Sequence, residues 1–121
     1  MSRILFIDDD PMTLETLKRS IEIFGHQAFL ASSGGEAEEL IIKQLPDLIM
    51  TDMNLPDTDG LELVKSLKSN PLSAHIPVVI LSASPEIDAT ENALSAGAEE
   101  YLTKPIRLDT LQNLIERYTS D

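Results

Sequence analysis

Residues 48–60 read Leu-Ile-Met-Thr-Asp-Met-Asn-Leu-Pro-Asp-Thr-Asp-Gly, an apolar run that passes abruptly into a polar loop. The first three residues are continuously apolar, as in a strand that is buried on both faces of a sheet. Thr51 and Asp52 follow directly, and the proline, acids and glycine behind them are typical of a loop. Asp52 is therefore predicted where a buried strand reaches solvent. In open α/β sheets, ligands bind beyond the carboxyl ends of the strands.

Four other segments have the pattern of short strands. The apolar run at 4–7 predicts a central strand, and the run at 77–81 is the richest in β-branched residues. The segment 27–31 has fewer branched residues and is expected at an edge of the sheet, and 100–102 is expected to be a short final strand.

Apolar residues recur at helical spacing after every strand. Asp10 followed by Pro11 predicts a helix N-cap, and Gly25 predicts the end of that helix. Further helices are expected to begin at Gly34 and at Gly60. The last helix is expected to carry four apolar residues on one face: Leu108, Leu111, Ile115 and Tyr118.

The helix expected at 87–96 has the weakest apolar face. Its stripe consists of Ile87, Ala93 and Leu94, followed by Gly97 as the stop. Because few apolar contacts would hold it, we expect this helix to be the easiest to shift.

Length and alternation together predict one α/β domain over residues 1–121. A chain of 121 residues has the length of a single domain. Five strands that alternate with five helices imply right-handed crossovers and a parallel sheet with helices on both faces.

Composition excludes several classes of function. The net charge of -12 repels phosphate backbones and anionic lipids, so we expect no direct nucleic-acid binding and no membrane binding. The absence of cysteine excludes disulfides, thiolate metal sites and cysteine nucleophiles. The apolar run near the start is too short for a signal peptide or a membrane span, which predicts a cytoplasmic protein.

Polar side chains follow four of the predicted strands: Asp8 and Asp9, Asp52, Ser82, and Lys104. Because the carboxyl ends of parallel strands share one edge, we expect these residues to meet. Three adjacent carboxylates favour a hard divalent cation with oxygen ligands, and Mg²⁺ fits best. With the lysine and the hydroxyl beside them, the sequence predicts phosphoryl transfer to Asp52 as nucleophile.

In these residues the sequence resembles the receiver domain of two-component response regulators, and in length the single-domain chemotaxis type. The resemblance covers nearly the whole chain. It implies a flavodoxin-like, doubly wound five-stranded parallel sheet of order 2-1-3-4-5 with five flanking helices. The motifs that carry it are Asp8-Asp9, Asp52 with Asn54-Leu-Pro56 and Asp59-Gly60, Ser82-Ala83, and Thr103-Lys104-Pro105.

The resemblance also implies roles for the acidic residues. Asp9 and Asp52 would bind Mg²⁺ directly together with the backbone carbonyl of Asn54, and Asp8 would help through water. Asp52 would accept a phosphoryl group from a phosphohistidine on a sensor histidine kinase or a histidine phosphotransfer protein. The domain would assist its own phosphorylation and dephosphorylation rather than turn over an external substrate.

The remaining implied roles concern the switch. Lys104 would pair with the phosphoryl oxygens, Ser82 would bind one of them, and the ring of Tyr101 would turn inward. The Lys104-Pro105 bond matches the family's cis peptide. The helix at 87–96, the last strand and the last helix would then present the surface that an effector reads, in a monomer or a phosphorylation-dependent dimer. Asn54 and Ser84 would tune the lifetime of the phosphorylated state.

Several other interpretations are open at this point. Asp10 is read as a helix cap rather than a metal ligand, and Ser82 could be an ordinary turn residue and Tyr101 an edge-strand aromatic. An aspartyl-phosphate phosphatase of the haloacid dehalogenase type would need a second Asp at position 54, where this chain has Asn. An inert receiver-like scaffold would have lost an acid or the lysine. The chain could also be the receiver part of a longer regulator with a DNA-binding or enzymatic output domain.

Overall fold

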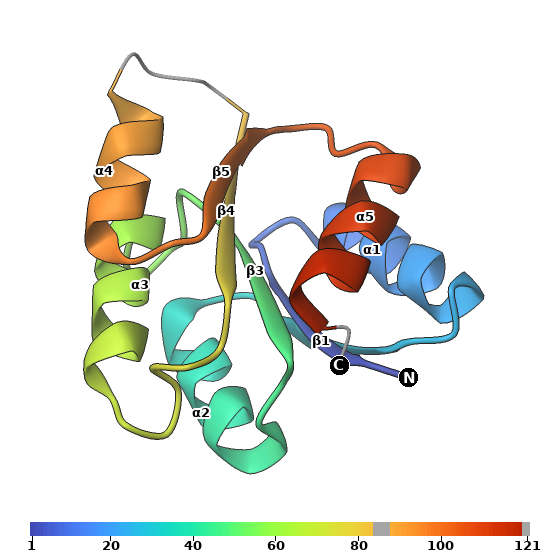
Figure 1. The fold of residues 1–121 in the computed structure, drawn as a ribbon, viewed down its shortest axis with the longest axis horizontal. Helices are drawn as coiled ribbons and strands as arrows, with labels where there is room; N and C mark the ends of the chain where they lie inside the picture. Colours follow the sequence, from blue (N-terminus) through green and yellow to red (C-terminus); the bar gives the residue numbers. More distant parts are fainter. Residues whose placement is uncertain (84–87, 120–121) are drawn as a thin grey trace.

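A computed structural model describes residues 1–83 and 88–119 (Figure 1). Within these residues, five parallel strands form one sheet in the order β2-β1-β3-β4-β5. The predicted sheet order is therefore confirmed, and the segment with few branched residues lies at an edge. The strands are β1 (Arg3–Ile7), β2 (Gln27–Ala31), β3 (Leu48–Asp52), β4 (Val78–Ser82) and β5 (Glu100–Thr103).

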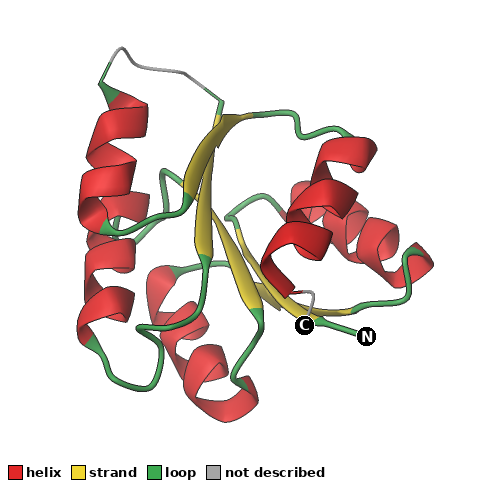
Figure 2. Ribbon diagram, in the orientation of Figure 1, coloured by secondary structure: helices red, strands yellow, loops and turns green. Residues whose placement is uncertain are grey.

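Helices cover both faces of the sheet (Figure 2). One face carries α1 and α5, and the other carries α2, α3 and α4. Among the described residues, no helix combines the length and the apolar content that crossing a bilayer would need. The helices are α1 (Pro11–Ile23), α2 (Gly34–Gln44), α3 (Gly60–Ser69), α4 (Ala89–Ala96) and α5 (Leu108–Thr119).

The central strands carry continuous apolar runs because both of their faces are buried. Successive strand residues point to opposite faces, so Phe6 and Met50 pack on the side of α1 and α5. Leu5 and Ile49, one position earlier, pack on the side of α2, α3 and α4. This continuous burial holds the strands' carboxyl ends in fixed positions.

Helix boundaries follow the predicted caps, but two predicted core residues are wrong. Leu94 is half exposed, because the buried face of α4 is set by Ala89 and Ala93, and the next residue is turned about 100° away. Leu108 is exposed because it is the first residue of α5, ahead of the turns that pack on the sheet. Two leucines that were not predicted in the core, Leu63 of α3 and Leu114 of α5, are buried. Two residues named in the predictions, Ser84 and Ile87, lie outside the described residues.

Substitution of Gly97 by alanine is expected to lower the free energy of unfolding more than substitution of Gly25. Both have positive φ, +112° and +87°, so alanine at either position costs about 1–2 kcal/mol. Only at Gly97 would the new Cβ also meet Lys68 Cγ at 2.9 Å, which adds about 1 kcal/mol or more. Urea denaturation of the two variants measures the difference, and equal losses would contradict this account.

Candidate functional site

The strand register brings the predicted polar residues to one edge of the sheet. Ile7 pairs with Thr51, so the residues that follow them, Asp8 and Asp52, lie at the carboxyl ends of neighbouring strands. Ser82 is the last residue of β4 and pairs with Thr103, directly before Lys104. The predicted convergence of the strand ends is therefore confirmed.

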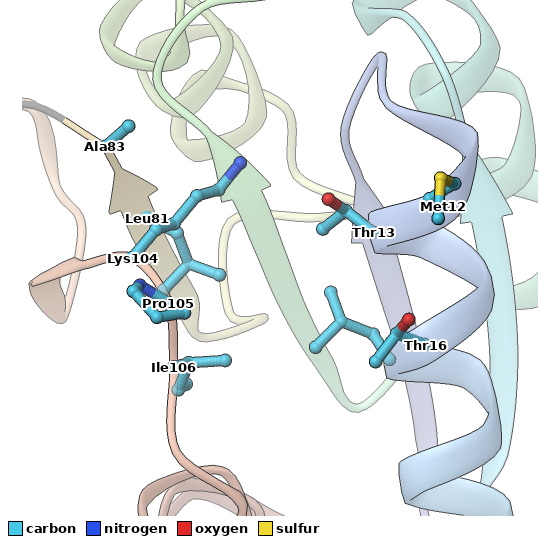
Figure 3. Close-up of a pocket in the computed structure, with 9 residues that line it drawn as sticks. Met12, Thr13, Thr16, Leu81, Ala83, Lys104, Pro105 and Ile106 are labelled. Atoms are coloured by element: carbon cyan, nitrogen blue, oxygen red, sulfur yellow. The ribbon is translucent and has the colours of Figure 1, made fainter.

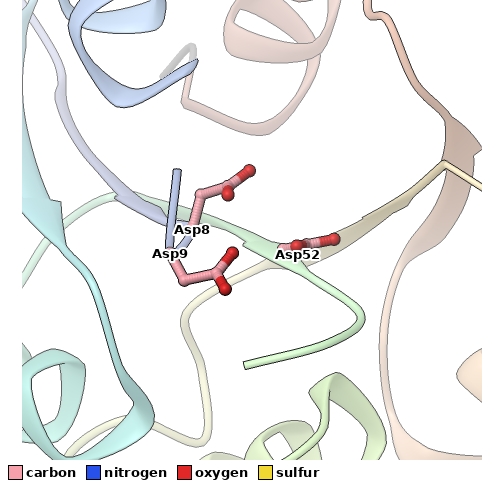
Figure 4. Close-up of side chains that lie close together, drawn as sticks. All are labelled: Asp8, Asp9 and Asp52. Atoms are coloured by element: carbon pink, nitrogen blue, oxygen red, sulfur yellow. The ribbon is translucent and has the colours of Figure 1, made fainter. Parts of the chain in front are cut away.

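Three carboxylates form a compact cluster at this edge (Figure 4). Asp8, Asp9 and Asp52 each offer one oxygen, and these oxygens all lie within 4.8 Å of one another. The three side chains differ in exposure, because Asp8 is buried, Asp52 is partly buried and Asp9 is exposed. The cluster is therefore open to solvent on the side of Asp9.

Lys104 joins two of these carboxylates. Its ammonium lies 2.5 Å from Asp8 Oδ2 and 3.4 Å from Asp52 Oδ1. Asp8 Oδ1 accepts a hydrogen bond from the Asp10 N–H at 2.9 Å, and Asp52 Oδ1 accepts one from the Met53 N–H at 2.8 Å. The lysine thus sits closer to the buried acid than to the predicted nucleophile.

The electrostatics of the cluster favour a further cation. The pKa of Asp52 is raised above its usual value of 3.8. Burial is the main cause of the rise; the positive charge of Lys104 opposes it, and the negative charge of Asp8 adds to it. Burial alone would lower the pKa of Lys104, but its hydrogen bond with Asp8 and the charges of Asp8 and Asp52 outweigh this and raise it. The ammonium is therefore firmly charged, yet it leaves the carboxylates incompletely neutralised.

The three other predicted residues surround a small pocket beside α4. Asn54, Ser82 and Tyr101 line this cavity of about 110 Å³ together with Ala89 and Asn92 of the helix. Ser82 is buried, and its backbone carbonyl accepts a hydrogen bond from the Lys104 backbone N–H at 2.8 Å. The predicted cis bond between Lys104 and Pro105 is present.

A second cavity, of about 480 Å³, borders Lys104 on the side of α1 (Figure 3). Its lining is mostly apolar, with Met12 of α1 on one side and Pro105 and Ile106 on the other. Met12 is 79% exposed. The carboxylate edge is therefore flanked by an open apolar groove, which the sequence analysis did not predict because its two walls are far apart in the chain.

Asp10 makes the predicted helix cap. Its carboxylate accepts hydrogen bonds from the Met12 N–H at 3.2 Å and from Thr13 Oγ1 at 2.7 Å. These hydrogen bonds, that of Thr13 first, lower the pKa of Asp10. Asp10 lies beside the cluster without belonging to the three grouped carboxylates.

Asp57 has a role that the sequence analysis missed. Its two oxygens accept hydrogen bonds from the Gly34 N–H at 2.8 Å and the Gly35 N–H at 2.9 Å. The loop after β3 is thereby tied to the amino end of α2, where the free N–H groups favour an anion. A stretch of acids in a loop gives no signal for a partner more than twenty residues away in sequence.

The hydrogen bonds from Gly34 and Gly35 to Asp57 are expected to make the stability of the fold depend on pH in the acid range. The two backbone hydrogen bonds lower the pKa of Asp57 below 3.8, so its stabilising effect is present above that value. The effect is lost as the pH falls through the lowered pKa. The melting temperature of Asp57→Asn should therefore lie below that of the parent at pH 7, and the gap should close in strong acid. The control is Glu39→Gln, which replaces an exposed carboxylate of α2 and should show no such gap.

Comparison with known proteins agrees with this geometry. Response regulator MprA of Mycolicibacterium vanbaalenii is 37% identical over 123 residues, which covers 98% of this chain and 52% of that protein. The chain spans about half the length of the curated relatives it matches.

Solved structures share the fold over almost the full chain. A two-component response regulator from Clostridium difficile has a TM-score of 0.91 and 30% identity, and covers 98% of this chain and 95% of that one. The signal receiver domain of a signal transduction histidine kinase from Syntrophus aciditrophicus has a TM-score of 0.90 and 32% identity, with coverages of 99% and 91%. The family model described as the response regulator receiver domain matches residues 4–116, and the chain therefore belongs to this family.

Proposed function

We propose that the chain is the phosphoacceptor switch of a two-component phosphorelay, with Asp52 as the residue that becomes an aspartyl phosphate. The observation that carries the proposal is the position of Asp52 within the acidic cluster, with the ammonium group of Lys104 3.4 Å away. Lys104 supplies one positive charge beside this carboxylate, and a cation held by the neighbouring acids would supply a second, so that an incoming phosphoryl group would also have a positive partner.

The donor set fits Mg²⁺. Opposite ligands of an octahedral Mg²⁺ are about 4.2 Å apart, and the three carboxylate oxygens lie within 4.8 Å of one another. Asp9 and Asp52 would hold the ion directly with the Asn54 carbonyl, and Asp8 through water. When bound, the ion would neutralise charge on the phosphoryl oxygens.

The chain's own residues would divide the transfer between them. Asp52 attacks phosphorus, a phosphorus–oxygen bond forms, and the phosphorus–nitrogen bond of the donor phosphohistidine breaks. Lys104 would pair with an oxygen of the new phosphoryl group. Because the Lys104 ammonium already lies 3.4 Å from Asp52, it would need only a short shift away from Asp8 to reach the new dianion.

The signal would then pass through the small pocket beside α4. The Ser82 hydroxyl would bind a phosphoryl oxygen, and Tyr101 would turn into the pocket that both residues line. Because α4 buries only Ala89 and Ala93, its position would be easily biased. The surface formed by α4, β5 and α5 would bind the effector, with the chain as a monomer or a phosphorylation-dependent dimer.

The partners follow from the same chemistry. The donor would be a sensor histidine kinase or a histidine phosphotransfer protein. Since the matching relatives are about twice as long as this chain, a DNA-binding or enzymatic output domain would be the alternative effector, joined to the receiver in one protein.

The proposal is tested by intact mass after incubation with acetyl phosphate. We expect one phosphoryl group to be gained in Mg²⁺ and none when Mg²⁺ is chelated. A chain that binds Mg²⁺ in a titration, but gains no phosphoryl group from either acetyl phosphate or a phosphohistidine donor protein, would exclude the proposed function.

The apolar groove beside Lys104 is expected to contact the donor protein. Met12→Glu places a charge on this groove at a 79% exposed position, so the fold should be unaffected. We expect transfer from a phosphohistidine donor protein to slow, because burial of the new carboxylate is unfavourable. Transfer from acetyl phosphate, which is too small to span the groove, should keep its rate. Equal slowing with both donors would contradict the assignment.

A further inference from the structure

One polar cluster, here called the Lys68–Glu99 clasp, joins the carboxyl end of α4 to its surroundings. The ammonium of Lys68, in the last turn of α3, donates to Glu99 Oε1 at 3.2 Å. It also donates to the carbonyls of Ile76 at 2.8 Å and Ala74 at 3.3 Å. One side chain therefore ties together α3, the turn before β4, and the turn after α4.

Glu99 completes the clasp on the other side. Its Oε2 accepts from the Val78 N–H at 2.5 Å, and its own N–H donates to the Val78 carbonyl at 2.8 Å. The side chains of Lys68 and Glu99 are only 20% and 31% exposed. A partly buried pair with several hydrogen bonds to the backbone around it holds its geometry better than an ordinary surface ion pair.

The clasp is also packed directly against the end of α4. The helix ends at Ala96 with Gly97 as its C-cap, and a Cβ at Gly97 would lie 2.9 Å from Lys68 Cγ. The Gly97 N–H donates to the Leu94 carbonyl at 3.1 Å, and the Ala98 N–H donates to the Ala93 carbonyl at 3.0 Å. The carboxyl end of α4 is thus capped by its own backbone and held by the lysine stem.

The amino end of α4 is held differently. The Asp88 side chain makes no capping hydrogen bond with the described residues. Ala89 and Asn92 line the same small pocket as Ser82. Among the described residues, the end of α4 that borders the proposed phosphorylation site is therefore held by fewer hydrogen bonds, and the clasped end is the opposite end of the helix.

We propose that the Lys68–Glu99 clasp is the pivot of the switch. On phosphorylation of Asp52, α4 tilts about its clasped end at Gly97, so that displacement is largest at Ala89 and smallest at Ala96. This inference rests on the proposed function and specifies how the signal is converted into motion. Without the clasp, phosphorylation of Asp52 would shift the whole of α4 or unwind its carboxyl end.

Amide hydrogen exchange by NMR tests the pivot at individual residues. The Asn92 N–H, bonded to the Asp88 carbonyl at 2.9 Å, reports on the amino half of α4. The Gly97 and Ala98 N–H groups report on the clasped end. Exchange is compared with and without Mg²⁺ and beryllium fluoride, a stable mimic of the phosphoryl group.

Two variants and a matched control isolate the clasp. Lys68→Met removes the ammonium but keeps an apolar stem against Gly97. Glu99→Gln keeps an acceptor for the Val78 N–H and serves if the first variant does not fold. Lys65→Met is the control, because Lys65 is in the same helix and makes only an exposed pair with Glu62 at 3.5 Å among its described ion pairs.

In the unactivated protein, Lys68→Met is expected to raise exchange at Gly97 and Ala98 about tenfold, which corresponds to about 1.4 kcal/mol. Exchange at Asn92 should be unchanged, and Lys65→Met should match the parent at all three amides. On activation of the parent, we expect a change at Asn92 alone. In Lys68→Met the change should spread to Gly97 and Ala98.

Two outcomes would overturn the pivot: equal changes at all three amides in the activated parent, or identical behaviour of Lys68→Met and Lys65→Met. The intact mass after acetyl phosphate treatment of the same preparation separates this failure from failure of the proposed function. If neither acetyl phosphate nor a phosphohistidine donor protein gives phosphoryl uptake, the proposed function fails, and the pivot with it, although exchange in the unactivated variants still shows whether the clasp anchors α4.

Discussion

Asp52→Asn is expected to abolish phosphoryl uptake from both acetyl phosphate and a phosphohistidine donor protein. An amide oxygen is a far weaker nucleophile than a carboxylate, and the substitution also removes one of the three charges of the acidic cluster. Intact mass after incubation in Mg²⁺ measures the result. Loss below detection is the largest effect that we predict for a single substitution in this chain.

Asp10→Asn is the matched control for this experiment. Asp10 is two residues from Asp8, but asparagine is as good a helix N-cap as aspartate, so α1 should keep its cap. Phosphoryl uptake should therefore remain at the parent level. Uptake that persists in Asp52→Asn, or disappears in Asp10→Asn, would assign the phosphoryl group to a different carboxylate.

The sign of the stability change in Asp52→Asn also follows from the structure. Because the pKa of Asp52 is raised, its ionised form is less favourable in the folded protein than in the unfolded chain. Protonated Asp52 therefore stabilises the folded protein at acid pH, and this contribution is lost as the pH rises through the raised pKa. With Mg²⁺ chelated at pH 7, Asp52→Asn should melt no lower than the parent, which shows that loss of uptake is not loss of folding.

Lys104→Met is expected to have the second largest effect, on both transfer and stability. Removing a positive group that faces the developing charge costs about 10²–10³ in rate. The side chain of Asp8 is only 4% exposed, and breaking a buried ion pair by removing one partner costs about 3–5 kcal/mol. Rates of uptake from acetyl phosphate and urea denaturation measure the two effects separately.

The affinity for Mg²⁺ should not fall in Lys104→Met, unlike the transfer rate and the stability. Without the ammonium, the three carboxylates repel one another more strongly, so the affinity for Mg²⁺ should be equal or higher in Lys104→Met. Mg²⁺ should then restore part of the lost stability, because a ligand that binds only the folded state stabilises it. Weaker Mg²⁺ binding in this variant would contradict the geometry.

Lys104→Arg separates charge from shape. Arginine keeps the positive charge beside Asp8 but presents a planar group with a different reach. We expect it to recover more of the stability than of the transfer rate. If arginine recovered both fully, the exact position of the ammonium would be unimportant for transfer.

The local features of the sequence determined most of the fold. Continuous apolar runs identified the central strands because both faces of a parallel sheet are buried. Asp10, Gly25 and Gly97 marked helix ends because caps depend on one or two residues and their own backbone. The acidic cluster was also predictable, since every parallel strand delivers its carboxyl end to the same edge.

Which helical residues are buried was less predictable. Leu94 and Leu108 have apolar side chains at plausible positions, yet they face solvent. Burial depends on where a neighbouring element ends and on the rotation of the helix about its axis. Neither of these is contained in the helix's own sequence, so a hydrophobic residue near the edge of a stripe was assigned to the core incorrectly.

The sequence by itself determined the five-stranded fold, the edge at which the acids meet and the family to which the chain belongs. Only the tertiary structure decided that Lys104 lies closer to Asp8 than to Asp52, that Asp57 ties a loop to α2, and that Lys68 and Glu99 clasp α4. The physical reason is that caps and apolar periodicity are properties of adjacent residues. Hydrogen bonds and ion pairs between distant residues depend on separations of a few ångströms, which are set when all the elements pack together.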